Sequence, residues 1–175
     1  MIAPLVSRLT VTDISYHMLS FGKNQLAHVE RKNLRFALAA HRALPFAANV
    51  ADVILAGWSF CYAAIHAGER WQAALEGALA EVARVLRPGG KLLVIESLGT
   101  GFETPHAPDV LVDYLNYLNT LKFQSTWIRT DYCFKDKEEA QQLTRFFFGD
   151  APMPMQMTEA GVIVPECTGL WWKTY

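Results

Sequence analysis

The sequence has 175 residues, of which 51% are hydrophobic and 19% are charged, and its formal net charge is −1. This length and composition are typical of one globular α/β domain with a substantial core, and they exclude a disordered chain. The Lys and Arg residues form no cluster, so the electrostatic footprint of a nucleic-acid-binding protein is absent and a small molecule is the expected partner.

The three cysteines, Cys61, Cys133 and Cys167, are an odd number at wide spacing and form no CxxC pair. This pattern argues against a disulfide framework, and the sequence has no cluster of His and Cys ligands for a metal. The first residues lack the charged and long apolar regions of a signal peptide, and no apolar run approaches the ~20 residues that span a bilayer. We therefore expect a cytoplasmic protein with no metal and no membrane segment.

The first half of the chain alternates short apolar runs with helical periodicity. The longest apolar stripe lies in a helix predicted over 69–87, which Pro88-Gly89-Gly90 stops. The run Val53-Ile54-Leu55 is apolar on both faces, as in a buried parallel strand. Strands that alternate with helices predict a parallel sheet with right-handed crossovers. In chain order we expect a strand at 9–12, a helix at 15–32, strands at 34–39 and 50–56, the helix at 69–87 and a strand at 91–96.

The pattern changes after residue 97. Asp136 and Glu139 have the spacing of a capping box and predict a helix start, and Gly149 predicts its end. The expected elements are a loop at 99–108, a helix at 110–121, a strand at 123–130, a helix at 136–148 and a closing β-hairpin formed by 161–165 and 168–173.

Four segments, in this order and spacing, carry a resemblance. They are the strand, acid, Ser and Met-Leu of residues 9–19, the segment Ala43-Leu44-Pro45-Phe46, the run 50–54, and the helix and Pro-Gly-Gly turn of 79–92. Together they resemble class I, Rossmann-like S-adenosylmethionine-dependent methyltransferases of the methyltransferase type 11 kind. The resemblance implies S-adenosyl-L-methionine as cofactor. It also implies a mostly parallel sheet with helices on both faces and a C-terminal antiparallel hairpin. Residues 1–175 would form one domain, with 1–96 binding the cofactor and 97–175 forming a variable substrate side.

Asp13 is the best-supported site residue within this resemblance. An acid at the carboxyl end of a strand can accept hydrogen bonds from two ribose hydroxyls. Asp13 can equally serve as a cap for the helix that follows. Ile14 would lie along the adenine face, with a place in the core as its alternative.

The other candidate residues follow two later strands. Ala40 stands where the family usually has an acid for the adenine amino group, and the neighbouring His41 could supply a backbone N–H or a ring nitrogen. Ligands in open α/β sheets sit beyond the carboxyl ends of strands, where this chain places Ala56, Gly57 and Trp58. Trp58 is a candidate wall of the substrate pocket, or a core aromatic. The remaining candidate substrate contacts are Tyr62, His66, Tyr114 and Tyr117.

The glycine-rich loop of the family is missing from this sequence. It normally precedes the acid by about twenty residues, whereas only twelve residues precede Asp13 and none of them is glycine. We therefore expect an N-terminally truncated domain whose sheet lacks its first strand. Either the two flanking strands pair directly, or the native protein starts upstream, or another chain fills the gap, which would make a homo- or hetero-oligomer through the open sheet edge.

Methyl transfer to a small-molecule acceptor is the leading functional hypothesis, and no residue stands out as a general base. The alternative is a non-catalytic, methyltransferase-like binding or scaffold subunit that pairs with a partner chain. A third reading is a nicotinamide oxidoreductase, because the ribose-binding acid is shared between the two folds. The Leu44-Pro45-Phe46 segment and the Pro88-Gly89-Gly90 turn argue against the third reading.

Overall fold

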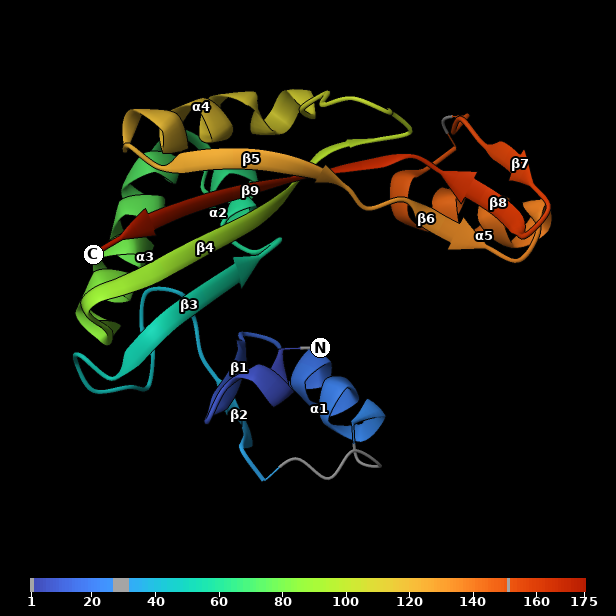
Figure 1. The fold of residues 1–175 in the computed structure, drawn as a ribbon. Coiled ribbons are helices and arrows are strands. Elements are labelled where there is room, and N and C mark those ends of the chain that lie inside the picture. Colours follow the sequence, from blue (N-terminus) through green and yellow to red (C-terminus); the bar gives the residue numbers. More distant parts are fainter. Residues whose placement is uncertain (1, 27–31, 151) are drawn as a thin grey trace.

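The computed structural model describes residues 2–26, 32–150 and 152–175, which form three sheets and several helices (Figure 1). The strands are β1 (Leu9–Asp13), β2 (Leu34–Leu38), β3 (Ala51–Gly57), β4 (Leu86–Thr100), β5 (Gln124–Arg129), β6 (Tyr132–Phe134), β7 (Gln156–Thr158), β8 (Gly161–Val164) and β9 (Glu166–Thr174). The helices are α1 (Tyr16–Gln25), α2 (Cys61–His66), α3 (Trp71–Val85), α4 (Val112–Thr120) and α5 (Lys137–Phe148), with 3-10 turns at Ala3–Leu5, Gly68–Arg70 and Asp109–Leu111.

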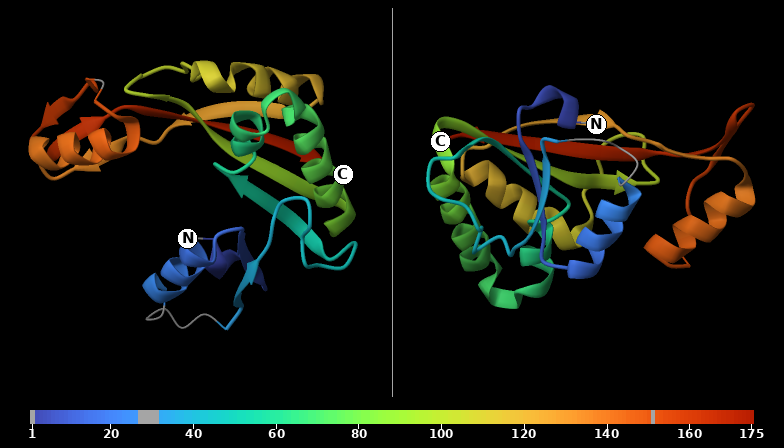
Figure 2. Two further views of the ribbon diagram at one scale, coloured as in Figure 1. Left: turned by 180° about the vertical axis from the view of Figure 1, so that it is seen from behind. Right: turned by 90° about the horizontal axis from the view of Figure 1, so that it is seen from below.

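The central sheet has the strand order β3-β4-β9-β5. β3 and β4 are parallel and are joined through α2 and α3, while β9 runs antiparallel to both β4 and β5. Helices α2, α3 and α4 pack on one face of this sheet, as the views from behind and from below show (Figure 2). The sheet is therefore a mixed α/β layer whose parallel part carries the predicted site.

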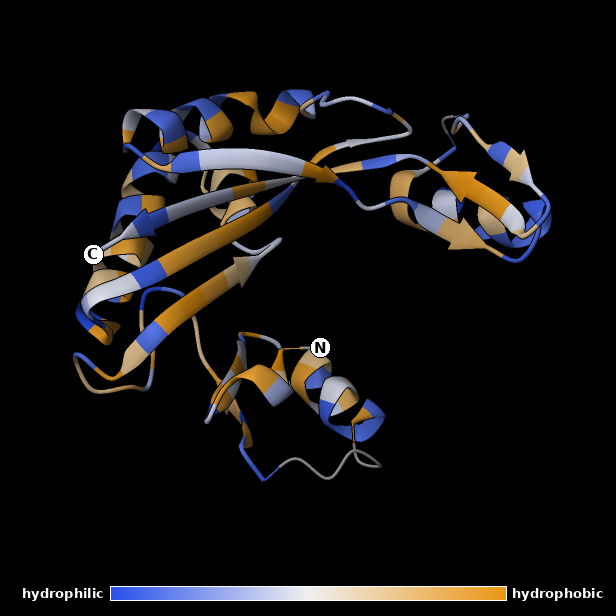
Figure 3. Cartoon of the chain, viewed as in Figure 1, coloured by the Kyte–Doolittle hydropathy of each residue, from blue (hydrophilic) through white to orange (hydrophobic). Residues whose placement is uncertain are grey.

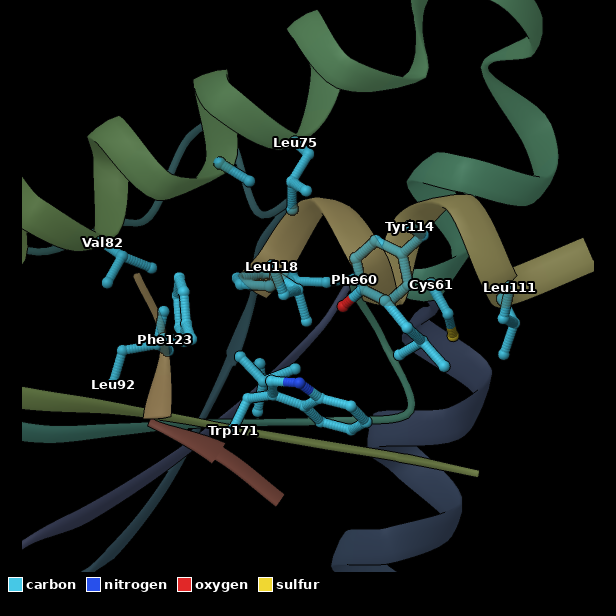
Figure 4. Close-up of a cluster of buried hydrophobic side chains, with 14 of the residues drawn as sticks. Phe60, Cys61, Leu75, Val82, Leu92, Leu111, Tyr114, Leu118, Phe123 and Trp171 are labelled. Atoms are coloured by element: carbon cyan, nitrogen blue, oxygen red, sulfur yellow. The ribbon is translucent and has the colours of Figure 1, made fainter. Parts of the chain in front are cut away.

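The hydrophobic core lies between this sheet and those helices (Figure 4). The apolar stripe predicted for the long helix is buried: Leu75, Ala78, Val82 and Val85 of α3 are each at most 3% exposed. Leu75, Ala78 and Val82 belong to one buried cluster with Leu92 of β4 and with residues of α4. Because complete burial of one Leu or Val contributes roughly 1.5–3 kcal/mol, this interface is the main source of stability for the central sheet.

A separate two-stranded unit precedes the central sheet. β1 and β2 pair in parallel, and α1 joins them and contacts both. Ser15 caps α1, since its Oγ accepts a hydrogen bond from the Met18 backbone N–H at 3.3 Å. The helix predicted over 15–32 ends at Gln25, and part of that prediction, residues 27–31, lies outside the described residues.

The Leu44-Pro45-Phe46 segment is fastened to α3 after β2. Glu81 accepts a hydrogen bond from the Leu44 N–H at 2.9 Å, and Arg84 donates to the Phe46 carbonyl at 2.8 Å. The hydrogen bond from Arg84 lowers the pKa of Glu81 to about 2. Together these two side chains fix the path of the chain from β2 to β3.

The C-terminal part differs from the predicted hairpin. The two segments predicted to pair are β8 and β9, which belong to different sheets and are separated only by Pro165. β8 lies between β6 and β7, and β9 lies between β4 and β5. The hairpin prediction was wrong in its pairing, although both strands and an antiparallel C-terminal sheet are present.

Other element boundaries also differ from those predicted from the sequence. α3 ends at Val85, and β4 already begins at Leu86 and runs through the Pro-Gly-Gly turn to Thr100. The sequence did not predict α2 or the short strands β6 and β7. Within residues 2–26, 32–150 and 152–175, no helix is both long and apolar enough to span a bilayer.

Candidate functional site

The carboxyl ends of β1 and β3 lie at the same end of the molecule. The His41 ring, in the turn after β2, packs edge-on against the Phe60 ring just after β3, with 5.1 Å between centroids. The same imidazole lies close enough to Asp13, at the end of β1, to interact with its charge. Three segments that are distant in the sequence, all predicted to bear site residues, are therefore brought together.

Asp13 closes β1 and is half-buried. Its Oδ1 accepts a hydrogen bond from the Ser15 backbone N–H at 2.7 Å, which closes a local turn before α1. The N-cap of α1 is Ser15, so the prediction that Asp13 caps this helix was wrong. Among the described residues no hydrogen bond reaches the second carboxylate oxygen, Oδ2, so this is the oxygen on which a ligand could bind. Ile14 is 75% exposed, which places it outside the core and in a position to offer an apolar surface beside Asp13.

Ala40 and His41 form the turn that follows β2. The Ala43 N–H donates to the Ala40 carbonyl at 3.0 Å, which closes the turn. Burial lowers the pKa of His41, and the nearby Asp13 opposes this shift. His41 is therefore favoured in its neutral form, in which one ring nitrogen accepts a hydrogen bond and the other donates one.

Trp58 follows β3 in an unusual backbone conformation. Its φ of 45° is in the left-handed region, which is strained for a bulky residue and is often found at functional sites. Its N–H donates to the Ile95 carbonyl at 2.8 Å, and its indole Nε1 donates to Ser97 Oγ at 3.2 Å. The side chain is 51% exposed, so Trp58 is a surface wall and not the core aromatic of the alternative reading.

The two residues before Trp58 present no side-chain groups to a ligand. Ala56 is 6% exposed and its side chain belongs to the hydrophobic core, so only its backbone is available to a ligand. A Cβ at Gly57 would make an ordinary contact of 3.6 Å with Leu55, so nothing in the described structure requires glycine there.

The candidate substrate residues separate into two groups. Tyr62 and His66 of α2 stack in parallel with ring centroids 5.6 Å apart, and Tyr62 is 55% exposed. Tyr114, in contrast, is only 1% exposed, and its hydroxyl donates to Glu96 Oε1 at 2.9 Å. Tyr114 is therefore part of the core and is not available to a substrate at the surface.

Two polar residues at the end of β4 were not predicted. Ser97 holds the Trp58 indole, and Glu96 is fully buried beside Tyr114 and the Cys61 backbone N–H, which donates to Oε1 at 3.1 Å. Burial raises the pKa of Glu96, and burial also raises the pKa of the Cys61 thiol to about 12. The rule that ligands bind beyond the carboxyl ends of strands could have identified Ser97, since the strand predicted over 91–96 ends immediately before it.

The residues at these strand ends fit the adenosine half of S-adenosylmethionine. Asp13 offers the ribose its carboxylate oxygen Oδ2, and Ile14 offers an exposed apolar side chain. The turn at Ala40 and His41 offers backbone polar groups and an imidazole ring to a base. The described residues have no turn after a parallel strand whose successive glycines could hold the amino-acid half. Nor do they contain three or more His, Cys, Asp or Glu side chains grouped for a metal ion.

Comparison with known proteins adds the family. The methyltransferase domain family matches residues 1–94. The ubiquinone/menaquinone biosynthesis C-methyltransferase UbiE of Hahella chejuensis is 38% identical over 108 residues, which are 61% of this chain and 38% of that protein. This chain thus spans well under half the length of that relative.

Solved structures agree in fold. A methyltransferase of unconfirmed function, BH2331 from Bacillus halodurans, superposes with a TM-score of 0.58 at 14% identity, over 99% of this chain and 85% of that one. The N-methyltransferase NodS from Bradyrhizobium japonicum, solved with S-adenosyl-L-homocysteine, gives a TM-score of 0.50 at 13% identity, over 98% and 68% of the two chains. The fold is that of Rossmann-like methyltransferases. Because the family matches more than half of the sequence, this chain belongs to the methyltransferase domain family.

Proposed function

We propose that this chain binds S-adenosylmethionine and serves methyl transfer to a small-molecule acceptor. The observation that carries the proposal is that His41, beside the charge of Asp13, packs against Phe60, which follows Trp58 by two residues, in a member of the methyltransferase domain family. The relative UbiE transfers methyl groups to carbon and NodS to nitrogen, so the acceptor atom is not the same throughout these proteins.

Methyl transfer requires the protein mainly to align the methyl donor with the acceptor. When bound, S-adenosylmethionine supplies an electrophilic methyl group, so proximity and orientation account for much of the rate. Asp13 would hold the ribose through Oδ2, while its Oδ1 stays bonded to Ser15. Trp58, locked by Ser97, would form a wall that excludes water from the acceptor.

Titration calorimetry with S-adenosylhomocysteine tests this proposal. We expect the chain to bind, and Asp13→Asn to weaken binding by about ten-fold or more, the scale of a charge-assisted hydrogen bond. Asparagine keeps an oxygen for the Ser15 N–H, so this local hydrogen bond is preserved while the charge is lost. The matched control is Asp52→Asn, because Asp52 is on β3, far from its carboxyl end, and pairs with Arg87.

Two results would contradict the proposal. One is equal affinity of Asp13→Asn and the unaltered chain. The other is an absence of binding in a chain that circular dichroism shows to be folded.

A second function, binding of a partner chain as a non-catalytic subunit, is favoured by one observation. Among the strands of residues 2–26, 32–150 and 152–175, β1 pairs only with β2 and β3 pairs only with β4, so each has an edge without a described neighbour. Open edges are ready templates for another strand. A monomer that transfers methyl groups without any partner would rule this function out, whereas a stoichiometric complex that is needed for folding would support it.

A further inference from the structure

Three methionines line one groove in the C-terminal part of the chain. Met153, Met155 and Met157 alternate with Pro154 and Gln156 in the segment that follows α5. All three border an open groove of about 620 Å³, and residues of α5 form its other wall. The expectation of no metal concerned His and Cys ligands, and the thioether sulfur of methionine is a different kind of ligand.

The register of β7 explains why these side chains share the groove. Met157 is opposite Val162 of β8, and residues directly opposite each other in an antiparallel pair lie on one face of the sheet. Val162 is 1% exposed and α5 contacts β8, so this is the face that α5 covers (Figure 1). Side chains of an extended chain return to the same face at every second residue. Met155 and Met153 accordingly border the same groove as Met157.

The core of this small sheet does not depend on the three methionines. Its buried residues come from α5 and β8, and they are Ala140, Thr144, Val162 and Val164. Figure 3 shows β8 as an apolar strand beside the mixed polar and apolar residues of α5. Met157 is 68% exposed, and Met153 and Met155 are half-buried. Three flexible side chains therefore stand at the wall of an open groove.

Thioether sulfur is a soft ligand that selects Cu(I) among the biological metals. Methionine has three rotatable bonds, so its sulfur can adjust its position. Alternate residues of an extended segment are about 7 Å apart. The sulfur atoms of Met153 and Met157 can therefore both turn toward that of Met155, which makes a three-sulfur site for one ion.

The other groups in the groove favour a soft cation over a hard one. Among the described residues that line it, Asp150 alone carries a carboxylate, and Asp150 pairs with Arg145. Mg²⁺ and Ca²⁺ need several oxygen ligands, which this groove does not offer. The exposed thiol of Cys133 is not a competing ligand in the groove, because Cys133 is opposite Ile163 and lies on the other face of the sheet.

We propose that Met153, Met155 and Met157 form a binding site for one Cu(I) ion. This site is independent of the function proposed above, because the residues that line the groove do not include Asp13, His41 or Trp58. Metal binding and cofactor binding can therefore be measured separately.

NMR of methionine methyl groups tests the site. The chain, labelled with ¹³C at these methyls, is titrated with Ag(I), which is a soft analogue of Cu(I) and is stable in air. A Cys133→Ser background removes the exposed thiol, whereas Cys61 and Cys167 are buried. We expect the signals of Met153, Met155 and Met157 to shift together and to saturate at one equivalent. Met18 on α1 is 55% exposed, so it is a matched thioether whose signal should not shift.

Substitutions measure the contribution of each sulfur in the same background. Met155→Leu removes the central sulfur and nearly conserves the apolar volume. Its affinity for Cu(I), measured without oxygen by competition with the chelator bicinchoninate, should fall by about ten-fold or more. Met157→Leu should have the same effect, and its exposed position ensures that the variant folds. Met18→Leu is the control, and its affinity should equal that of the background chain.

Three results would overturn the proposal. The first is a shift of Met18 as large as those in the groove, which would mean adventitious binding to any exposed thioether. The second is a shift of only one or two of the three groove methionines. The third is full affinity for Cu(I) in both Met155→Leu and Met157→Leu, in chains that circular dichroism shows to be folded.

Discussion

The buried pair of Tyr114 and Glu96 allows a sharp test of the core. Tyr114→Phe removes only the hydroxyl that donates to Glu96 Oε1 at 2.9 Å. The carboxyl is fully buried, and within the described part of the chain its Oε2 has no hydrogen-bond partner. After the substitution, the Cys61 N–H is the remaining donor to Oε1.

The expected loss depends on the charge of Glu96. A hydrogen bond between neutral groups contributes about 0.5–1.5 kcal/mol, and one to a charged group about 1.5–3 kcal/mol. Burial raises the pKa of Glu96, so its contribution to stability is complete below the unfolded pKa and is lost as pH rises through the folded pKa. The Tyr114 hydroxyl opposes that rise, so its removal should cost more at high pH than at low pH.

Urea unfolding of both proteins at pH 4.5 and pH 8.5 measures this difference. We expect Tyr114→Phe to lower the free energy of unfolding by roughly twice as much at pH 8.5 as at pH 4.5. Tyr117→Phe is the control, because the Tyr117 hydroxyl bonds to Glu76 at the surface, where a smaller and salt-sensitive loss is expected. An identical loss at the two pH values would refute the assignment of Glu96 as a buried, titrating partner.

Two further substitutions test packing and backbone, each by urea unfolding. Leu75→Ala in the core should lower the free energy of unfolding by about 2–5 kcal/mol. Leu5→Ala, at a residue that is 83% exposed, should change it little. Equal losses in the two variants would show that α3 does not pack as described. Gly161→Ala should lower the free energy of unfolding by about 1–3 kcal/mol, because its φ is +137° and a Cβ there would overlap the Phe134 carbonyl oxygen. Gly22→Ala in α1 meets no atom within 4 Å and should stabilise by about 0.5–1 kcal/mol, so a gain at Gly161 would contradict the turn geometry.

Elements with strong local patterns could be predicted from the sequence. The stripe on α3 and the cap at Asp136, whose side chain accepts from the Glu139 N–H, are local in origin, and both helices are present. The parallel strands β1 to β4 also followed from apolar runs between helices. The partner of β9 could not be predicted this way, because Pro165 suits a turn and the pairing with β4 depends on contacts distant in sequence.

The site was predictable where it depends on strand ends. Asp13 and Trp58 follow β1 and β3 directly, and the rule for ligands in α/β sheets identifies such positions. Tyr114 was wrongly predicted to contact the substrate, although its helical spacing with Leu111, Leu115 and Leu118, which are all buried, indicates the core. Glu96 was missed because a carboxylate at the end of an apolar strand gives no sign that a tyrosine will meet it.

The place of β9 in the central sheet governs the order in which that sheet can assemble. Within the described part of the chain β5 pairs with β9 alone, and β9 pairs with β4 across roughly 70 to 80 residues of sequence. The loop-closure entropy of bringing residues 91–97 and 168–174 together must be overcome before β5 gains any backbone partner. β3, α3 and β4 can form a compact unit first. β5 and α4 take their final places only when β9, the last strand of the chain, inserts between β4 and β5.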